Sequence, residues 1–180
     1  MSMKNTFLFI AVMATLSVFG QPKVFNSSTV ATFEAGNMIF NTVRGSIQGA
    51  QGRAIYEDGI LTAISGSLDI NTLKSGNRTR DGHLKKKEEF FNIEKTPRIY
   101  FLANDVLFVG KTNGTTTYKL SGSLTLRGVS NEMSLEIKET SKNHLVGTFT
   151  VNRDLWGLGE GWSKTIISQD IDVQVDIHLE

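Results

Sequence analysis

The last residues of the chain strictly alternate between apolar and polar side chains. Residues 171–179 read Ile-Asp-Val-Gln-Val-Asp-Ile-His-Leu, with an apolar residue at every second position. Successive side chains of an extended chain point to opposite faces, so this pattern predicts a β-strand with one dry face. Seven earlier segments, most of them with the same alternation, are also predicted strands: residues 29–35, 43–56, 60–70, 97–103, 118–126, 133–137 and 145–151.

Turn-forming residues separate most of these segments. They occur as GAQG (49–52), NGTTT (113–117), RGVSNE (127–132), TSKNH (140–144) and GLGEG (157–161). About eight strands in succession predict an all-β fold with an antiparallel sheet. Closing such a sheet into an up-and-down barrel removes its exposed edges. The interior of an eight-stranded barrel is either filled by side chains or holds one small ligand.

The first twenty residues differ in kind from the rest. They carry one charge, Lys4, and then an uncharged run from Phe7 to Phe19. A membrane-spanning helix needs about 20 apolar residues, and this shorter run is typical of a secretory signal peptide cleaved after Gly20. An uncleaved membrane anchor is the alternative. We expect residues 21–180 to form a single domain, periplasmic or secreted, with no stable membrane insertion after cleavage.

Charge and composition narrow the function classes. The chain has 19 basic and 18 acidic residues, and the signal peptide holds one lysine and no acid, so the two signs balance in the mature protein. Nucleic-acid binding needs a one-sided basic field, and we therefore expect no nucleic-acid partner. Because the chain has no cysteine, its fold must rest on packing without disulfides.

One segment interrupts the strand pattern. Residues 81–91 favour a short helix, since Asp81 can cap its start and residues 83–91 contain no glycine or proline. Leu84 and Phe91 lie seven positions apart and would share a face. We interpret the charged run at 85–89 between them as a solvated face.

The ionisable residues form no catalytic or metal-binding motif. His83, His144 and His178 are the only histidines and lie in separate segments, so we expect no metal site. Asp81 beside Arg80 is most simply a salt bridge that pins the helix to the barrel, and we expect no catalytic residue.

The order of motifs along the chain resembles one family, the YceI-like proteins. An Arg-Asp-x-His-Leu stretch precedes a double phenylalanine, a Pro-x-Ile-x-Phe strand and a Gly-x-Leu-Thr-x-x-Gly-Val strand, and a late segment reads VNRDLWGLGEG. The residues that carry these motifs are Arg80, Asp81, His83, Leu84, Phe90, Phe91, Pro97, Ile99, Phe101, Gly122, Leu124, Thr125, Gly128, Val129, Asn152, Arg153, Trp156 and Gly157.

The resemblance implies an exported protein whose lipocalin-like antiparallel barrel holds a polyisoprenoid or similar long-chain lipid in an elongated apolar pore. It implies no catalytic activity and no cofactor other than the bound lipid. On this reading Leu84, Phe90 and Phe91 turn inward, and Arg80, Asp81 and His83 hold the helix through polar contacts. The expected lipid-lining residues are Phe33, Phe40, Phe91, Phe101, Leu126, Phe149, Trp156, Val173 and Val175, with Trp162 as a further candidate.

Two other functions remain open at this level. A barrel filled by side chains would suit a structural or interaction protein that binds another protein through its surface. An enzyme would use Arg80, Asp81 and His83 on a small lipid head group. A homodimer is also left open.

Overall fold

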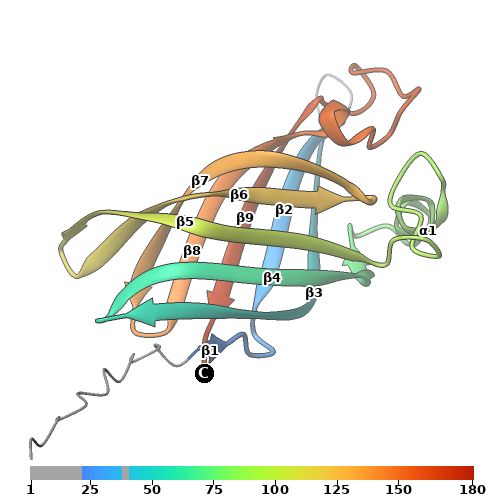
Figure 1. Cartoon of the computed structure of the whole chain (residues 1–180). Coiled ribbons are helices and arrows are strands. Elements are labelled where there is room, and N and C mark those ends of the chain that lie inside the picture. Colours follow the sequence, from blue (N-terminus) through green and yellow to red (C-terminus); the bar gives the residue numbers. More distant parts are fainter. Residues whose placement is uncertain (1–21, 38–40) are drawn as a thin grey trace, which may run out of the picture.

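The computed structural model describes residues 22–37 and 41–180, and its elements follow one another almost entirely as strands (Figure 1). The signal peptide expected at 1–20 and the lining residue Phe40 lie outside this range. The elements are β1 (Lys23–Val24), β2 (Val30–Asn37), β3 (Asn41–Glu57), β4 (Ile60–Lys74), α1 (Arg78–Lys86), β5 (Arg98–Thr112), β6 (Thr115–Leu126), β7 (Val129–Ser141), β8 (His144–Asn152), the 3-10 helix η1 (Arg153–Trp156) and β9 (Asp170–His178).

Eight strands, β2 to β9, form a closed antiparallel barrel. Each strand pairs with the next along the chain, and β9 pairs back with β2 in a register that places Phe33 opposite Val173. The short strand β1 adds to β3, where Lys23 faces Ala54, and its residue Val24 also exchanges main-chain hydrogen bonds with Glu180. The predicted eight-stranded barrel is therefore confirmed, with each strand at or near its expected place.

Tight turns connect several neighbouring strands. β5 and β6 are joined through Asn113 and Gly114, at φ angles of 50° and 83°, and β6 and β7 through Arg127 and Gly128, at 52° and 77°. Type I′ two-residue hairpins have positive φ at both central positions, and the twist of such a turn matches that of the paired strands. Asparagine and glycine adopt this conformation readily, whereas Arg127 is an uncommon residue for it.

The GAQG segment is not a turn. It lies inside β3, whose pairing with β4 shifts register between Ser46 and Gln48 and again between Gln48 and Gln51. Gly49 has a φ of 66°, and the Gln48 amide donates to Thr72 Oγ1 at 2.7 Å in place of a main-chain acceptor. Glycine here produces a β-bulge, which lets one long strand bend around the barrel.

The helix is present, but it starts and ends earlier than 81–91. Its N-cap is Asn77, whose side chain accepts from the Arg80 amide at 3.0 Å, and not Asp81. The Asp81 carboxylate instead accepts from the Ser75 amide at 2.8 Å and from its hydroxyl at 2.5 Å. After Lys86 the chain turns, and the Phe91 amide donates to the Leu84 carbonyl. Phe90 and Phe91 therefore follow the helix in a turn rather than inside it.

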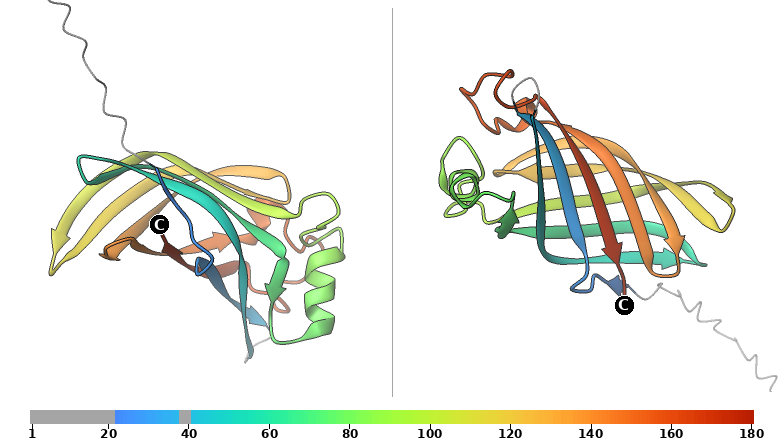
Figure 2. Two further views of the ribbon diagram at one scale, coloured as in Figure 1. Left: turned by 90° about the horizontal axis from the view of Figure 1, so that it is seen from below. Right: turned by 180° about the vertical axis from the view of Figure 1, so that it is seen from behind.

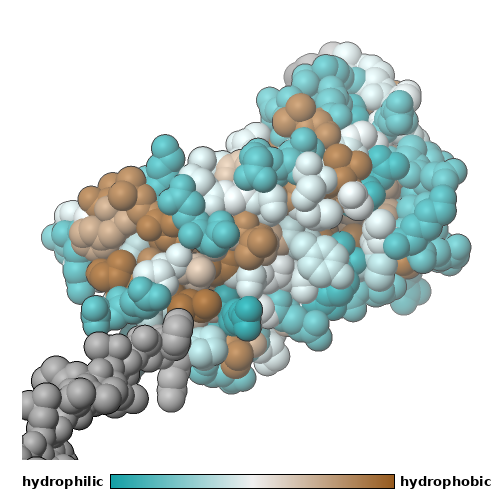
Figure 3. Space-filling model, in the orientation of Figure 1, coloured by the Kyte–Doolittle hydropathy of each residue, from teal (hydrophilic) through white to brown (hydrophobic). Residues whose placement is uncertain are grey.

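Helix α1 and the loop after η1 lie at one end of the barrel, and the β5–β6 hairpin and the C-terminus lie towards the other (Figures 1 and 2). None of the helices in the described part of the chain is long and apolar enough to cross a membrane. Around the β5–β6 hairpin the outer surface exposes Leu107, Phe108 and Val109. Figure 3 shows apolar colour gathered at that end of the molecule.

Candidate functional site

The barrel encloses an elongated cavity of about 540 Å³. All eight barrel strands contribute to its wall, and most contributing side chains are apolar. Pockets of about 300–1,000 Å³ with mostly apolar walls are typical of sites for small molecules. The interior is therefore hollow rather than filled by side chains.

The cavity ends on a tightly packed cluster of buried residues. Leu120, Leu135, Ile137 and Ile177 belong both to this cluster and to the cavity wall. Beyond them the cluster fills the barrel end with further buried side chains, among them Ala54, Leu61, Tyr118, Leu145 and Leu179. The cavity is therefore closed at the end that carries the β3–β4 and β7–β8 turns.

Two tyrosines reach one carboxylate in this closed end. The hydroxyls of Tyr56 and Tyr118 donate to the two oxygens of Glu139 at 3.4 and 3.5 Å. Burial raises the pKa of Tyr56 well above its ordinary value, and the negative charge of Glu139 adds to the effect. Burial raises the pKa of Tyr118 as well. Both phenols therefore stay protonated over the physiological range.

The opposite end of the cavity forms its mouth. Here the wall residues Asn77, Thr79, Arg80, His83 and Leu84 come from the α1 segment. Facing them, the loop after η1 contributes Leu158, Trp162, Ile166 and Ile167. Trp162 and Ile166 are 37% and 38% exposed, so apolar surface continues from the cavity to the outside.

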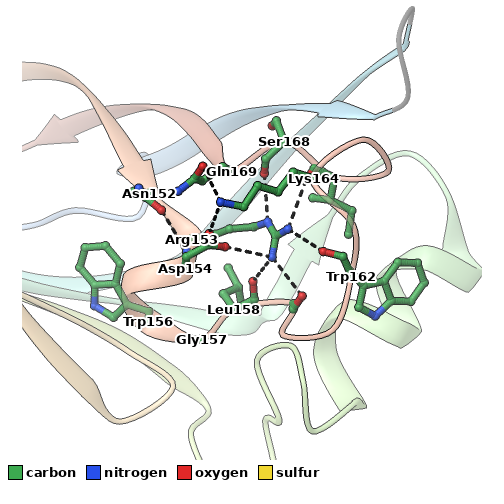
Figure 4. Close-up of polar contacts among 12 residues, drawn as sticks. Asn152, Arg153, Asp154, Trp156, Gly157, Leu158, Trp162, Lys164, Ser168 and Gln169 are labelled. Carbon is green, nitrogen blue, oxygen red and sulfur yellow. Dashed lines mark hydrogen bonds and ion pairs between the residues drawn. The ribbon is translucent and has the colours of Figure 1, made fainter.

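A single buried arginine organises the loop at the mouth (Figure 4). Arg153 is only 3% exposed, and its guanidinium donates five hydrogen bonds to main-chain carbonyls within the loop. The acceptors are Ser168 at 3.0 Å, Leu158 at 2.9 Å, Gly159 at 3.0 Å, Trp162 at 3.0 Å and Ile167 at 3.3 Å. These bonds use all five donors of the guanidinium. They satisfy loop carbonyls that would otherwise bond within a helix or sheet, so Arg153 holds the loop in one conformation.

The loop is also tied to the segment that follows α1. The Arg127 guanidinium donates to the carbonyls of Trp156 and Gly157 on one side and of Glu88 on the other. The Trp162 ring packs on Phe90 with centroids 5.6 Å apart. These contacts hold the two sides of the mouth at a fixed separation.

Seven of the nine expected lining residues lie on the wall of this one cavity, as does the further candidate Trp162. The seven are Phe33, Phe91, Phe101, Leu126, Phe149, Val173 and Val175. The strand alternation placed the strand residues inward, and the chain turn after α1 placed Phe91 there. That they contact a lipid stays a prediction.

Trp156 corrects the expected list. It does not belong to the wall but is 3% exposed in a core cluster with Leu124, Leu126 and Val151. Its indole Nε1 donates to the Leu124 carbonyl at 3.0 Å. The 3-10 turn that starts at Arg153 breaks the strand alternation, so the side chain turns away from the cavity and supports the barrel.

Of the three residues expected to hold α1 through polar contacts, Arg80 and Asp81 make such contacts and His83 makes none within the described part of the chain. Arg80 and Asp81 converge on Ser75, with Arg80 Nε donating to the Ser75 hydroxyl at 2.8 Å and its Nη2 to the Ser75 carbonyl at 2.5 Å. They therefore anchor the helix, as expected, but through this serine rather than through a mutual salt bridge. The His83 imidazole has no hydrogen-bond partner among residues 22–37 and 41–180 and is exposed at the mouth. Leu84 and Phe90 face the cavity.

Two important residues had been given no role from the sequence. Ser75 is 4% exposed and joins Arg80 to Asp81, while Arg153 appeared only as part of a motif. Arg153 could have been singled out because a glycine-rich stretch with few apolar residues follows it. Such a loop has little packing to hold it, so a nearby side chain with many hydrogen-bond donors is a candidate to do so. Nothing in the sequence around Ser75 distinguishes it from other serines.

Comparison with known proteins gives the family. The model of the YceI-like domain matches residues 23–179, which span the whole barrel. The chain belongs to the YceI-like domain family. Among curated relatives, UPF0312 proteins of Yersinia pestis (strain Pestoides F) and Yersinia pseudotuberculosis serotype O:1b (strain IP 31758) are 30% identical over 114 residues. The match covers 62% of this chain and 56% of each relative.

Solved structures share the fold at low sequence identity. BcnA of Burkholderia cenocepacia superposes with a TM-score of 0.74 at 12% identity, over 85% of this chain and 98% of BcnA. A polyisoprenoid binding domain from Saccharophagus degradans gives 0.69 at 13% identity, over 88% and 97%. The YCEI protein of Campylobacter jejuni gives 0.68 at 19% identity, over 81% and 89%. At these identities the likeness concerns the fold of this YceI-like domain.

Proposed function

We propose that this YceI-like protein binds a long-chain lipid, a polyisoprenoid or similar amphiphile, with the tail inside the barrel. The observation that carries the proposal is the 540 Å³ apolar cavity, closed at one end and open beside α1. The structural neighbour described as a polyisoprenoid binding domain supports it. Each methylene removed from water contributes about 0.8 kcal/mol, so a chain of several isoprene units gains on the order of ten kcal/mol before ordering costs.

The hollow interior counts against the alternative of a structural protein with a filled barrel. It also favours binding over catalysis, because most residues of the wall are apolar. Length and width of the cavity would select the tail, and a few polar groups at the mouth would select the head. We further propose that the protein is exported through its first twenty residues and acts in the periplasm or outside the cell.

Native mass spectrometry of protein purified gently from its own host tests these proposals together. We expect a mass that starts at Gln21 and carries one long-chain lipid, and the same spectrum reports whether the protein is a monomer or a homodimer. Protein that carries no lipid and takes none up from a polyisoprenoid extract would refute lipid binding. A mass that retains residues 1–20 would refute cleavage at this site.

A variant that fills the cavity makes the test specific. Val173 lies on the wall between Phe33 and Phe149, its cross-strand neighbours, and Val173→Trp would occupy the space that the tail needs. The matched control is Gln174→Trp, because the next residue of β9 points out of the barrel and is exposed. We expect Val173→Trp to lose the lipid and Gln174→Trp to retain it. Equal retention by both would show that the lipid sits elsewhere.

A further inference from the structure

The ionisable side chains of the cavity wall are all basic residues. Among the described residues that line it, Arg80, His83 and Arg153 are the ionisable ones, and no aspartate or glutamate belongs to this group. An apolar tail alone gives no reason for cationic groups beside it. These basic residues therefore indicate what kind of polar group the ligand carries beside its tail.

Arg153 is not free to bind a ligand. All five of its N–H donors already bond to carbonyls of the loop. That leaves Arg80 and His83, which lie three positions apart in α1 and so share one face of the helix. Both lie at the mouth.

The Arg80 guanidinium has unused donor capacity. Its side chain bonds only to Ser75, through Nε and Nη2, and Nη1 has no hydrogen-bond partner among residues 22–37 and 41–180. Within the same residues no carboxylate lies within 4 Å of it, since Asp81 is bonded to Ser75 instead. A half-buried guanidinium without a counter-ion favours an anion at its open side.

We propose that the ligand's head group is negatively charged, a carboxylate or a phosphate, and that Arg80 and His83 hold it at the mouth. This inference rests on the proposed binding of a lipid tail. The tail would extend from the mouth towards the closed end, while the planar guanidinium presents its remaining donors to two oxygens of the head.

Ligands with one tail and different heads test the inference. Delipidated protein is titrated with geranylgeranyl phosphate, geranylgeraniol and geranylgeranylamine, and binding is measured by calorimetry. We expect the phosphate to bind at least about tenfold more tightly than the alcohol, because charge-assisted hydrogen bonds are the stronger kind. The amine should bind more weakly than the alcohol, since its charge repels the mouth.

Variants locate the preference. Arg80→Gln and His83→Gln should each lower the affinity for the phosphate several-fold and lower that for the alcohol by less, so the preference for the phosphate narrows. Arg80→Lys keeps the charge and should keep part of the preference if the fold around Ser75 is intact. The matched control is Arg78→Gln, because Arg78 lies in the same helix but is exposed and off the wall. It should behave as the wild type.

The outcomes separate this inference from the proposed function. Equal affinity for phosphate and alcohol would overturn the anionic head and leave tail binding standing, whereas failure of all three ligands would overturn tail binding itself. If Arg78→Gln also lost the preference for phosphate over alcohol, that preference would come from the net charge of the protein. The proposal that Arg80 and His83 hold the head group would then be wrong. Inorganic phosphate should not displace geranylgeranyl phosphate, and its doing so would mean a site for free anions.

Discussion

Replacing Arg153 with lysine keeps the positive charge but removes the fork of donors that orders the mouth loop. The arginine satisfies five carbonyl oxygens between residues 158 and 168. A lysine ammonium has three donors on one nitrogen, so at least two of those oxygens lose their partner.

The expected loss of stability follows from these bonds. A hydrogen bond that involves a charged group contributes about 1.5–3 kcal/mol, so two lost bonds correspond to about 3–6 kcal/mol. Water can reach those acceptors that are only partly buried and recovers some of this. We therefore expect Arg153→Lys to lower the free energy of unfolding by about 2–3 kcal/mol, a large share of the 5–15 kcal/mol typical of a domain.

Urea unfolding gives the magnitude, and hydrogen exchange gives the location. Amides of residues 157–169 should exchange faster in Arg153→Lys, while the barrel strands keep their protection. The control is Lys164→Gln, because Lys164 pairs with Asp154 at 3.0 Å on the surface and such exposed pairs contribute about 0–1 kcal/mol. If Arg153→Lys unfolds within about 0.5 kcal/mol of the wild type with unchanged loop exchange, the loop is held by something other than Arg153.

Two further predictions concern the barrel itself. A Cβ on Gly122 would lie 2.0 Å from the Leu102 carbonyl oxygen, so Gly122→Ala should destabilise by about 1–3 kcal/mol or more; Gly110→Ala, with nothing within 4 Å of its Cβ, is the control, and equal urea midpoints for the two variants would contradict this. Above pH of about 10 the phenols of the unfolded chain ionise while Tyr56, whose pKa is raised, keeps its proton. The folded state then binds more protons, so the free energy of unfolding should fall as the pH rises; Tyr56→Phe should flatten this decline in urea titrations, and an unchanged slope would refute it.

The local sequence pattern was sufficient to predict which residues of the strands face the barrel interior. Alternation placed Phe33, Phe149 and Val173 on the inner face, because in an extended chain each residue points opposite to its neighbours. Alternation gave no guidance at Trp156, which lies beyond the predicted strand in a 3-10 helix. The turn expected at GAQG was wrong, since a glycine with positive φ suits a turn and a bulge equally well.

The bounds of the helix needed more than local pattern. Asn77 and Asp81 are both good N-caps, and Ser75, which lies outside the helix, decides between them by engaging the Asp81 carboxylate. The helix ends at Lys86, and the turn that follows places Phe90 and Phe91 on the cavity wall. Both decisions depend on where the helix sits against the barrel.

By itself, the amino-acid order determined the strands and most of the wall, because apolar residues at every second position give each strand one face that must be buried. The motif order likewise pointed to the family. The hollow interior, the closed end and the cationic mouth were decided by the tertiary structure. Whether inward side chains meet across a barrel or leave a cavity depends on its diameter, and whether an arginine is satisfied or free depends on carbonyls brought to it from elsewhere in the chain.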